Sequence, residues 1–245
     1  MIYDTETLPN IQYGWDTISE RPTPLEFIIK PKAIATIAWK WLGESETYVA
    51  VCEKPYDDRA PLAAFMEDAK RATHMVAHYS KFDKTFITGR LAANGMDPLP
   101  PVCDVCTYKM AKAAFGRSLN GNKLDNLGTV LGVGNKIKTN AMLWVRVASG
   151  DKDALEEMAL YNKQDVNLLE QVLLGIRPYV NNKINLNLLT ADHVTRCKTC
   201  NSDNVVHTGF EYTINSIRDR YVCKECKSYS TFPKKKVKKN EKMDA

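Results

Sequence analysis

Four acidic residues that are far apart in the chain have types and settings suited to binding a divalent metal. Asp4 and Glu6 lie in a short stretch at the start of the chain, Asp83 follows the apolar stretch 75–77, and Asp165 lies in a long helical pattern. Carboxylate oxygens are the ligands that Mg²⁺ and Mn²⁺ prefer. Each acid also has an ordinary explanation, so the metal hypothesis depends on whether the four act together.

Asp4 and Glu6 are two residues apart in a segment, 2–7, that we interpret as a strand. Side chains at this spacing point to the same face of a strand. Two like charges there repel each other and lose hydration, and a cation would correct both problems. The alternative is an exposed, frayed N-terminal strand.

Asp165 follows Tyr161 by four residues, so the two share one helix face, about 6 Å apart along the axis. A phenol beside a carboxylate can orient a water molecule that the carboxylate and a metal also contact. The alternative is a tyrosine in the core and a solvated aspartate. For Asp83, in the first turn of an expected helix, the alternative is stabilisation by the helix dipole.

Six of the seven cysteines form three C-x-x-C pairs. Cys197/Cys200 and Cys223/Cys226 are separated by 22 residues, a spacing that indicates a structural Cys₄ zinc site. The β-rich segments between them, 204–212 and 217–222, predict a hairpin and therefore a zinc ribbon. Because so short a segment buries little apolar surface, the metal would supply much of its folding energy.

The pair Cys103/Cys106 has no second pair nearby, so we expect ordinary buried thiols there, with a redox or metal role as the alternative. Cys52 stands alone. His207 lies between the two zinc-type pairs and could ligate, but a surface position on a strand is the expectation.

Basic and aromatic residues surround the zinc-type pairs. The basic ones are Arg196, Lys198, Arg218, Arg220, Lys224 and Lys227, and the aromatic ones are Phe210, Tyr212, Tyr221 and Tyr229. Cations bind phosphates and aromatic rings stack on unpaired bases. A small solvated domain whose aromatics form its own core is an equally good interpretation.

The order of expected elements indicates an α/β fold. Strands are expected at 2–7, 33–41, 47–52, 75–77 and 102–104, and helices at 61–71, 81–93, 105–114, 123–131 and 153–174. Strands followed by alternating strands and helices predict a mixed sheet with helices on its faces. Residues 8–31 are interpreted as a long connection.

Composition and charge limit which functions the protein could have. The chain has 245 residues, of which 44% are apolar, and it has neither an apolar run of membrane-spanning length nor a secretory signal. We therefore expect a cytoplasmic protein with no membrane partner. Residues 191–245 hold 12 basic and 7 acidic residues, whereas the rest of the chain is neutral. A basic appendage on a neutral body indicates nucleic acid as the partner.

Three motifs together resemble those of the DEDD exonuclease superfamily, proofreading-type nucleases with a ribonuclease H-like fold. They are Ile2–Thr7 (IYDTET), Ala77–Asp83 (AHYSKFD) and Tyr161–Asp165 (YNKQD). The tyrosine four residues before the last aspartate is similar to the subtype that has tyrosine in place of histidine. Segments 31–44, 124–132 and 136–139 further resemble a phage-type branch, for which the host cytoplasm would be the location.

The resemblance implies a mixed five-stranded sheet flanked by helices, with a small β-rich zinc ribbon at the C-terminal end. It assigns residues 1–178 to the exonuclease domain. Residues 179–195 would be a linker, 196–232 the zinc ribbon, and 233–245 a basic disordered tail.

The implied activity is 3′→5′ hydrolysis of DNA, expected to be single-stranded, by a two-metal mechanism with Mg²⁺ or Mn²⁺. Asp4, Glu6, Asp83 and Asp165 would be the metal ligands, and Tyr161 would orient the attacking water. His78, Tyr79, Lys136, Lys138, Arg218 and Arg220 would contact the substrate. One departure concerns Tyr79, where the family usually has asparagine, so a phenol replaces an amide that could hydrogen-bond near the substrate. The alternatives are a catalytically weak or inactive nucleic-acid-binding protein on the same fold and a structure-selective endonuclease.

Overall fold

The structure is a computed structural model that describes residues 1–14, 23–180, 185–190 and 194–234. The chain forms two compact units, Met1–Leu173 and Leu174–Ala245. None of the helices in the described ranges is long and apolar enough to span a membrane.

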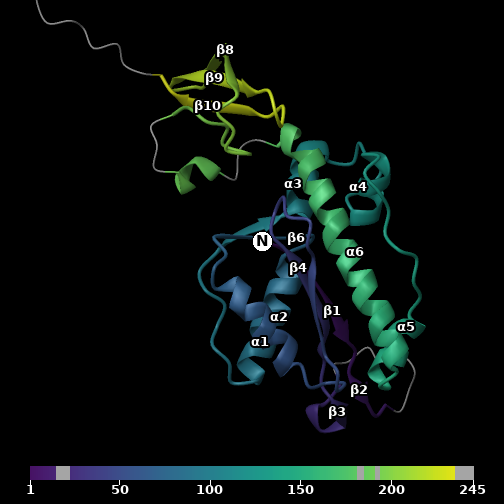
Figure 1. The fold of residues 1–245 in the computed structure, drawn as a ribbon. Helices are drawn as coiled ribbons and strands as arrows, with labels where there is room; N and C mark the ends of the chain where they lie inside the picture. Colours follow the sequence, from purple (N-terminus) through teal and green to yellow (C-terminus); the bar gives the residue numbers. More distant parts are fainter. Residues whose placement is uncertain (15–22, 181–184, 191–193, 235–245) are drawn as a thin grey trace, which may run out of the picture. The chain divides into compact units, whose positions relative to one another are not determined.

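The first unit is built on a five-stranded sheet in the order β5-β4-β1-β6-β7 (Figure 1). Its central strand β1 (Ile2–Leu8) pairs antiparallel with β4 (Ala33–Lys40) and parallel with β6 (His74–Ala77). The outer strands are β5 (Tyr48–Val51) and β7 (Cys103–Cys106). The predicted mixed five-stranded α/β architecture is therefore confirmed.

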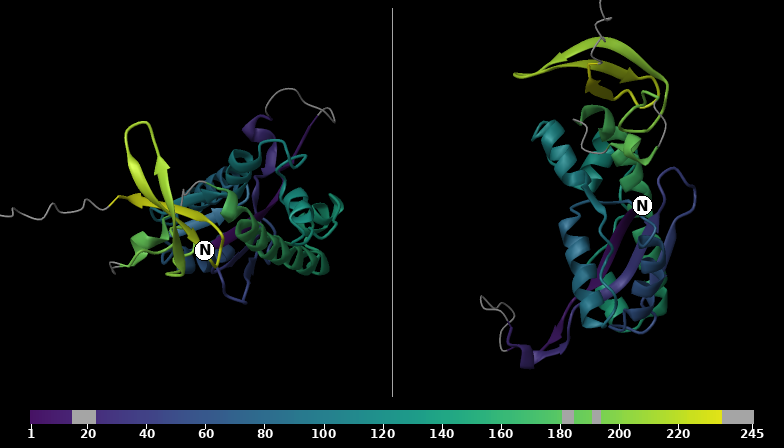
Figure 2. Two further views of the ribbon diagram at one scale, coloured as in Figure 1. Left: turned by 90° about the horizontal axis from the view of Figure 1, so that it is seen from above. Right: turned by 90° about the vertical axis from the view of Figure 1, so that its left-hand side faces the viewer.

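Six α-helices are described in this part of the chain. They are α1 (Arg59–Ala69), α2 (Lys81–Ala93), α3 (Thr107–Phe115), α4 (Leu124–Val130), α5 (Met142–Ala148) and α6 (Lys152–Ile176). The helices cover both faces of the sheet (Figure 2). Prediction found five of them and missed α5, whose seven residues are too short to show a clear helical period.

Strand β1 contributes to a separate core on each face of the sheet, because its side chains alternate. Tyr3 packs with Phe65 of α1 and Ile87 of α2, whereas Leu8 packs with Leu143 of α5 and Met158 of α6. All six side chains are at most 3% exposed. Asp4 and Glu6 lie an even number of residues before Leu8, so they are on the same face of β1 as Leu8 and face α6.

A β-bulge interrupts the pairing of β1 with β4. Glu6 is opposite Thr36 and Thr7 is opposite Ile34, which leaves Ala35 as an extra residue on β4. Because of this extra residue, Ile34 faces the α1 and α2 core, and Ala35 and Thr36 face α6. Bulges often redirect side chains beside active sites, and here the bulge lies next to Glu6.

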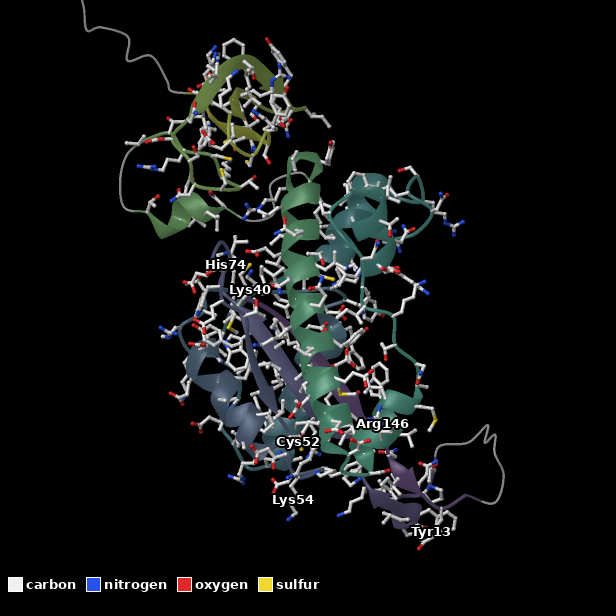
Figure 3. The ribbon with its side chains drawn as sticks, turned by 45° about the vertical axis from the view of Figure 1, so that its right-hand side comes forward. Tyr13, Lys40, Cys52, Lys54, His74 and Arg146 are labelled. Atoms are coloured by element: carbon white, nitrogen blue, oxygen red, sulfur yellow. The ribbon has the colours of Figure 1, made fainter. Side chains whose placement is uncertain are left out.

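Ion pairs hold α6 near both of its ends. Figure 3 labels two of the basic residues, Lys40 and Arg146. Lys40 of β4 lies 2.6 Å from Glu170, and both side chains are only 6% exposed. Near the other end of α6, Arg146 of α5 contacts Asp151 at 2.7 Å and Glu157 at 3.3 Å. These contacts fix the helix that carries Tyr161 and Asp165.

The expected connection 8–31 contains a small two-stranded sheet, of β2 (Ile11–Gln12) and β3 (Ile28–Lys30), and the short 3₁₀ helix Leu25–Phe27. The rest of the connection includes residues 15–22, which lie outside the described ranges.

The C-terminal unit contains a three-stranded antiparallel sheet in the order β10-β9-β8. Strands β8 (Val205–Tyr212) and β9 (Ile217–Cys223) form the predicted hairpin, and β10 (Tyr229–Pro233) was not predicted. The expected linker 179–195 includes the 3₁₀ helix Leu186–Leu189. Part of that linker, and the expected basic tail from residue 235 onward, lie outside the described residues.

Candidate active site

Three of the four predicted acids converge. Asp4, Glu6 and Asp165 each offer a carboxylate oxygen, and these oxygens all lie within 4.8 Å of one another. Asp4 and Glu6 come from β1, and Asp165 comes from the face of α6 that covers this strand. Residues of a strand and a helix that lie at least 159 positions apart in the chain thus form one acidic cluster.

Two side chains that prediction missed position the acids on β1. The Asn162 amide donates a 2.7 Å hydrogen bond to Oδ2 of Asp4, and its own oxygen accepts a hydrogen bond from Thr36. The Trp144 indole donates to Oε2 of Glu6 at 3.2 Å. Asn162 could have been recognised, because it lies three residues before Asp165 and therefore on the same helix face. Trp144 lies on α5, which was not predicted.

Asp83 stands at the edge of the cluster and outside the group of three. Its Oδ1 accepts hydrogen bonds from the backbone N–H of Thr5 at 3.1 Å and from the Thr5 hydroxyl at 2.7 Å. Even so, its carboxylate contributes the largest charge repulsion that raises the pKa of Asp4, ahead of Glu6. The charge of Asp83 therefore acts on Asp4, although its carboxylate is not among the three that converge.

Lys136 brings a positive charge into the cluster. Its Nζ lies 2.6 Å from Oδ2 of Asp165 and 5.2 Å from the centre of the Tyr161 ring. The same ammonium opposes the raised pKa values of Asp4, Glu6 and Asp83. Lys138, two residues further along the chain, is exposed.

Burial raises the pKa of every acid in the cluster. The pKa of Glu6 rises to about 7 and that of Asp83 to about 6, and the pKa values of Asp4 and Asp165 are also raised. In each case desolvation is the largest cause, and neighbouring carboxylates add to it for Asp4 and Glu6. Burial and the neighbouring carboxylates therefore disfavour the charged forms of these acids, which a bound cation would stabilise.

A divalent cation fits this cluster. Oδ1 of Asp165 is buried and accepts no hydrogen bond from the described part of the chain. An unpaired buried carboxylate oxygen is costly, and it lies among other oxygen donors of the type that Mg²⁺ and Mn²⁺ prefer. A cation would remove this cost and the mutual repulsion of the acids together.

Tyr161 lies beside the cluster, in edge-to-face contact with Trp144 at 6.1 Å between ring centres. Burial raises its pKa to about 12, so the phenol remains protonated at neutral pH. Its hydroxyl can therefore orient a water molecule, but it is a poor base.

His78 and Tyr79 differ in exposure and in hydrogen bonding. Nε2 of His78 donates to the carbonyl of Asn122 and Nδ1 accepts from the Thr107 hydroxyl, both at 2.9 Å. Burial lowers the pKa of His78 to about 4, so the ring is neutral. With both nitrogens engaged, His78 supports the loop rather than offering a donor to a substrate. Tyr79 is 56% exposed and has a backbone φ of +66°.

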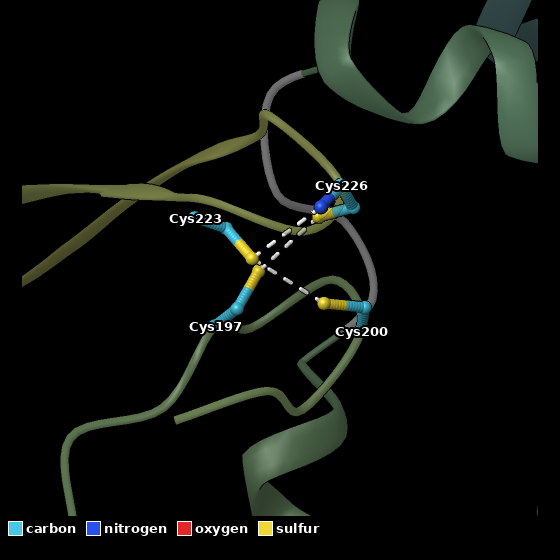
Figure 4. A group of neighbouring side chains, drawn as sticks. All are labelled: Cys197, Cys200, Cys223 and Cys226. Carbon is cyan, nitrogen blue, oxygen red and sulfur yellow. Dashed lines mark hydrogen bonds between the residues drawn. The ribbon is translucent and has the colours of Figure 1, made fainter. Parts of the chain in front are cut away.

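The second candidate metal centre is the cysteine cluster, by which we mean Cys197, Cys200, Cys223 and Cys226 (Figure 4). Their sulfur atoms all lie within 4.8 Å of one another, and all four residues are free of disulfides. The backbone N–H groups of Thr199 and Cys226 donate to the sulfurs of Cys197 and Cys223. Four converging thiols with N–H···S hydrogen bonds suit a tetrahedral zinc ion.

Cys103 and Cys106 cannot share an ion through the same geometry. They are three residues apart on β7, so their side chains point to opposite faces of the strand. Cys103 is exposed and Cys106 is buried. The expectation of two buried thiols is thus right for Cys106 and wrong for Cys103, which lies at the start of the strand.

Arg218 and Arg220 are exposed on β9, two residues apart and therefore on one face. The Arg220 guanidinium lies 5.8 Å from the ring centre of Tyr229 and donates to the carbonyl of Thr208. His207 lies on β8 between the rings of Phe210 and Tyr221, and not in the cysteine cluster.

The fold and the acidic cluster together define a ribonuclease H-like nuclease scaffold. Residues 30–174 match a family model described as the RNase H superfamily, and this range covers more than half of the chain. The chain therefore belongs to the RNase H superfamily, which supports a nuclease-type function in general. The matched range contains Asp83, Tyr161 and Asp165, and β1 lies before it. The chain has no match among the curated proteins.

Proposed function

We propose that this protein is a metal-dependent 3′→5′ exonuclease that hydrolyses phosphodiester bonds of single-stranded DNA. The convergence of Asp4, Glu6 and Asp165 within 4.8 Å, with Tyr161 on the same face of α6, carries this proposal. Membership of the RNase H superfamily supports the nuclease class. The 3′→5′ polarity and the DNA substrate rest on the resemblance of the three motifs to the tyrosine-type exonucleases.

Two Mg²⁺ or Mn²⁺ ions are the proposed cofactors. Asp4, Glu6 and Asp165 would hold one, and Asp83 together with Asp4 would hold the other. When bound, such a pair stabilises both the attacking and the leaving oxygen of an in-line displacement. Four carboxylates match the charge of two divalent ions.

The chain's own residues orient the reactants. Asn162 fixes the carboxylate of Asp4, and Trp144 fixes that of Glu6. The Tyr161 hydroxyl, protonated because its pKa is about 12, holds the attacking water by a hydrogen bond and does not remove its proton. Lys136 and Lys138 would bind backbone phosphates, and the exposed ring of Tyr79 would contact an unpaired base.

The C-terminal unit is proposed to be a zinc ribbon that helps to hold the substrate. The cysteine cluster would bind one structural Zn²⁺. Arg218 and Arg220 present two cations on one face of β9, and Phe210, Tyr212 and Tyr229 are exposed aromatics on the same small sheet. Three of the four aromatic candidates are thus exposed and available for stacking, whereas Tyr221 is half-buried.

A comparison of two aspartate variants on α6 tests the active site. We expect Asp165→Asn to reduce Mn²⁺-dependent cleavage by more than the roughly 10–100-fold that outer-shell changes cost. Asp153→Asn changes an exposed aspartate in the first turn of the same helix and is the matched control. Near-normal cleavage by Asp165→Asn, with the fold intact by circular dichroism, would refute the site.

End-labelled linear and circular single strands test the polarity and the exonuclease class. We expect mononucleotides from the 3′ end of linear DNA and no degradation of circles. Degradation of circles would favour the endonuclease alternative. Binding without any cleavage in Mg²⁺ or Mn²⁺ would favour an inactive nucleic-acid-binding protein.

A further inference from the structure

Lys136 occupies an unusual position for a substrate-binding lysine, because it is paired with a proposed metal ligand. Its ammonium lies 2.6 Å from Oδ2 of Asp165, whose side chain is 1% exposed, whereas the lysine side chain is 31% exposed. One end of this ion pair is therefore fixed in the interior, and the other end can reach solvent.

The backbone of Lys136 is held in place independently of this ion pair. Its N–H donates to Oδ1 of Asp125 at 2.8 Å, and Asn135 beside it accepts a hydrogen bond from Thr129. Gly134 packs so closely on Gly128 of α4 that a Cβ at position 128 would collide with its carbonyl oxygen. The loop is thus anchored to α4, and the long side chain is the part that can change partner.

The ammonium and a divalent cation would compete for the same carboxylates. Lys136 lowers the pKa of Asp4, Glu6, Asp83 and Asp165, so its charge acts on all four proposed ligands. A divalent ion among these carboxylates would place two like charges close together, and their repulsion is strong where the surroundings are buried. The lysine side chain can relieve this repulsion by turning toward solvent, where the substrate phosphates would lie.

We propose that Lys136 is a movable cation shared between the metal site and the substrate. Without a divalent ion its ammonium pairs with Asp165. When an ion binds, the ammonium is displaced and pairs with a phosphate of the nucleic acid. Metal binding and substrate binding are then coupled through one side chain, and the coupling acts in both directions. This inference rests on the proposed metal-dependent nuclease function.

The first test measures Mn²⁺ binding by calorimetry to the full-length, zinc-loaded protein without nucleic acid. Lys136→Met keeps an aliphatic chain over Tyr161 but removes the competing charge, so we expect Mn²⁺ to bind at least about tenfold more tightly, or roughly 1.4 kcal/mol. Lys136→Arg keeps a cation that can pair with Asp165 through two hydrogen bonds, so we expect affinity equal to or weaker than that of the native chain.

Lys138→Met is the matched control, because it removes the same charge from the same loop at an exposed position. We expect it to change the Mn²⁺ affinity by less than about twofold, because exposed charges at a distance are screened. Equal affinities of Lys136→Met and the native chain would overturn the proposal, as would an equal gain in Lys138→Met. If Lys136→Met does not fold, tighter binding by Lys136→Arg than by the native chain overturns it.

The second test asks where the displaced ammonium goes. The probe is a single-stranded DNA with phosphorothioate linkages at its 3′ end, titrated at several salt concentrations in Ca²⁺ and in metal-depleted buffer. With Ca²⁺ we expect Lys136→Met to reduce the slope of log affinity against log salt by about 0.7, the contribution of one phosphate contact on a single strand. Without Ca²⁺ we expect no reduction, because Asp165 then holds the ammonium.

Any effect of Lys138→Met should be the same in both buffers. A metal-independent effect of Lys136→Met on the slope would overturn the exchange. Failure of the proposed function itself is recognised separately, because Asp165→Asn would then leave Mn²⁺ binding unchanged.

Discussion

Tyr79 is the residue at which the chain departs most clearly from the family it resembles. Its φ of +66° lies in the left-handed region, which a bulky L-residue enters at a cost of roughly 1–2 kcal/mol. Asparagine, the residue that the resembled exonucleases usually have in this motif, tolerates that region much better. The backbone at Tyr79 thus has a conformation that asparagine tolerates better than tyrosine, and the tyrosine ring contacts Tyr108 edge-to-face at 5.5 Å.

We therefore predict that Tyr79→Asn is more stable than Tyr79→Ala by up to about 1 kcal/mol in chemical denaturation. Both variants lose the contact with Tyr108, so the difference reports only how well each residue tolerates a positive φ. Tyr79→Gly should be at least as stable as Tyr79→Ala for the same reason. An asparagine variant no more stable than the alanine variant would show that the strain is absent.

Trp144 controls Glu6 through a single hydrogen bond, which stabilises the charged form of the carboxylate. Trp144→Phe removes the donor but keeps a ring against Tyr161. We predict that the pKa of Glu6 rises by roughly one unit above its value of about 7, since a hydrogen bond to a charged group is worth about 1.5–3 kcal/mol.

The measurement for Trp144→Phe is the pH dependence of Mn²⁺ affinity, which should shift to higher pH because the metal binds the charged carboxylate. Val145→Ala, at a half-exposed position on the same helix, is the control and should leave this dependence unchanged. The prediction is contradicted if both variants give the native pH profile.

At the scale of elements, the contact between α4 and the loop that follows it sets the position of Lys136. We predict that Gly128→Ala destabilises the protein by about 1–3 kcal/mol, because the new methyl group meets the Gly134 carbonyl and Cδ1 of Leu168 at 2.8 Å. Gly89→Ala is the matched control, since Gly89 lies within α2 with open space around it. It should gain up to about 1 kcal/mol from helix propensity. Urea denaturation of both variants decides whether the close approach or the helix propensity dominates at Gly128.

Elements whose apolar residues recur with a clear helical or strand period could be predicted from the sequence, whereas elements held mainly by tertiary contacts could not. Helix α2 has the predicted bounds, Lys81–Ala93, because a polar start and Asn94-Gly95 mark its ends. Helix α5 was missed because it is short and is held by packing on Leu8 and by the ion pairs of Arg146. The role of Trp144, which lies on α5, was therefore not predicted either.

The same distinction holds for the candidate site. The four acids and Tyr161 could be selected because their motifs occur in a recognisable order. The hydrogen bonds of Asp83 to Thr5 and the ion pair of Lys136 with Asp165 join residues 78 and 29 positions apart. No local pattern encodes such pairings, so these two roles became visible only in the folded chain.

At the scale of the whole molecule, the acidic cluster makes stability depend on pH and on metal together. Buried carboxyl groups whose pKa is raised hold protons in the native state that the unfolded chain has already released. These acids together therefore lower the free energy of unfolding of the metal-free protein as the pH rises through this range, and they act against the opposite effect of His78, whose pKa is lowered to about 4. For Asp83 the range ends at about pH 6, and for Glu6 at about pH 7.

We predict that the melting temperature of the protein without Mg²⁺ decreases between about pH 4.5 and pH 7, and that saturating Mg²⁺ raises it more at pH 7 than at pH 5. Below this range the acids are protonated in both the native and the unfolded state, so the cluster destabilises the native state little. Above it they are charged, each pKa unit corresponds to about 1.4 kcal/mol, and Mg²⁺ offsets the repulsion. Exposed acids such as Asp151, whose pKa is lowered by hydrogen bonding and by Arg146, lose their contribution only below about pH 4 and do not obscure the effect.

The double variant Glu6→Gln, Asp83→Asn is the control, because it removes the two groups that titrate in this range while keeping their shapes. Its melting temperature should change much less with pH, and Mg²⁺ should stabilise it weakly at both pH values. If the native protein without Mg²⁺ instead showed the same pH dependence as the double variant, Glu6 and Asp83 could not have raised pKa values. The cluster would then be neutralised within the protein, and it would have little need of a metal ion.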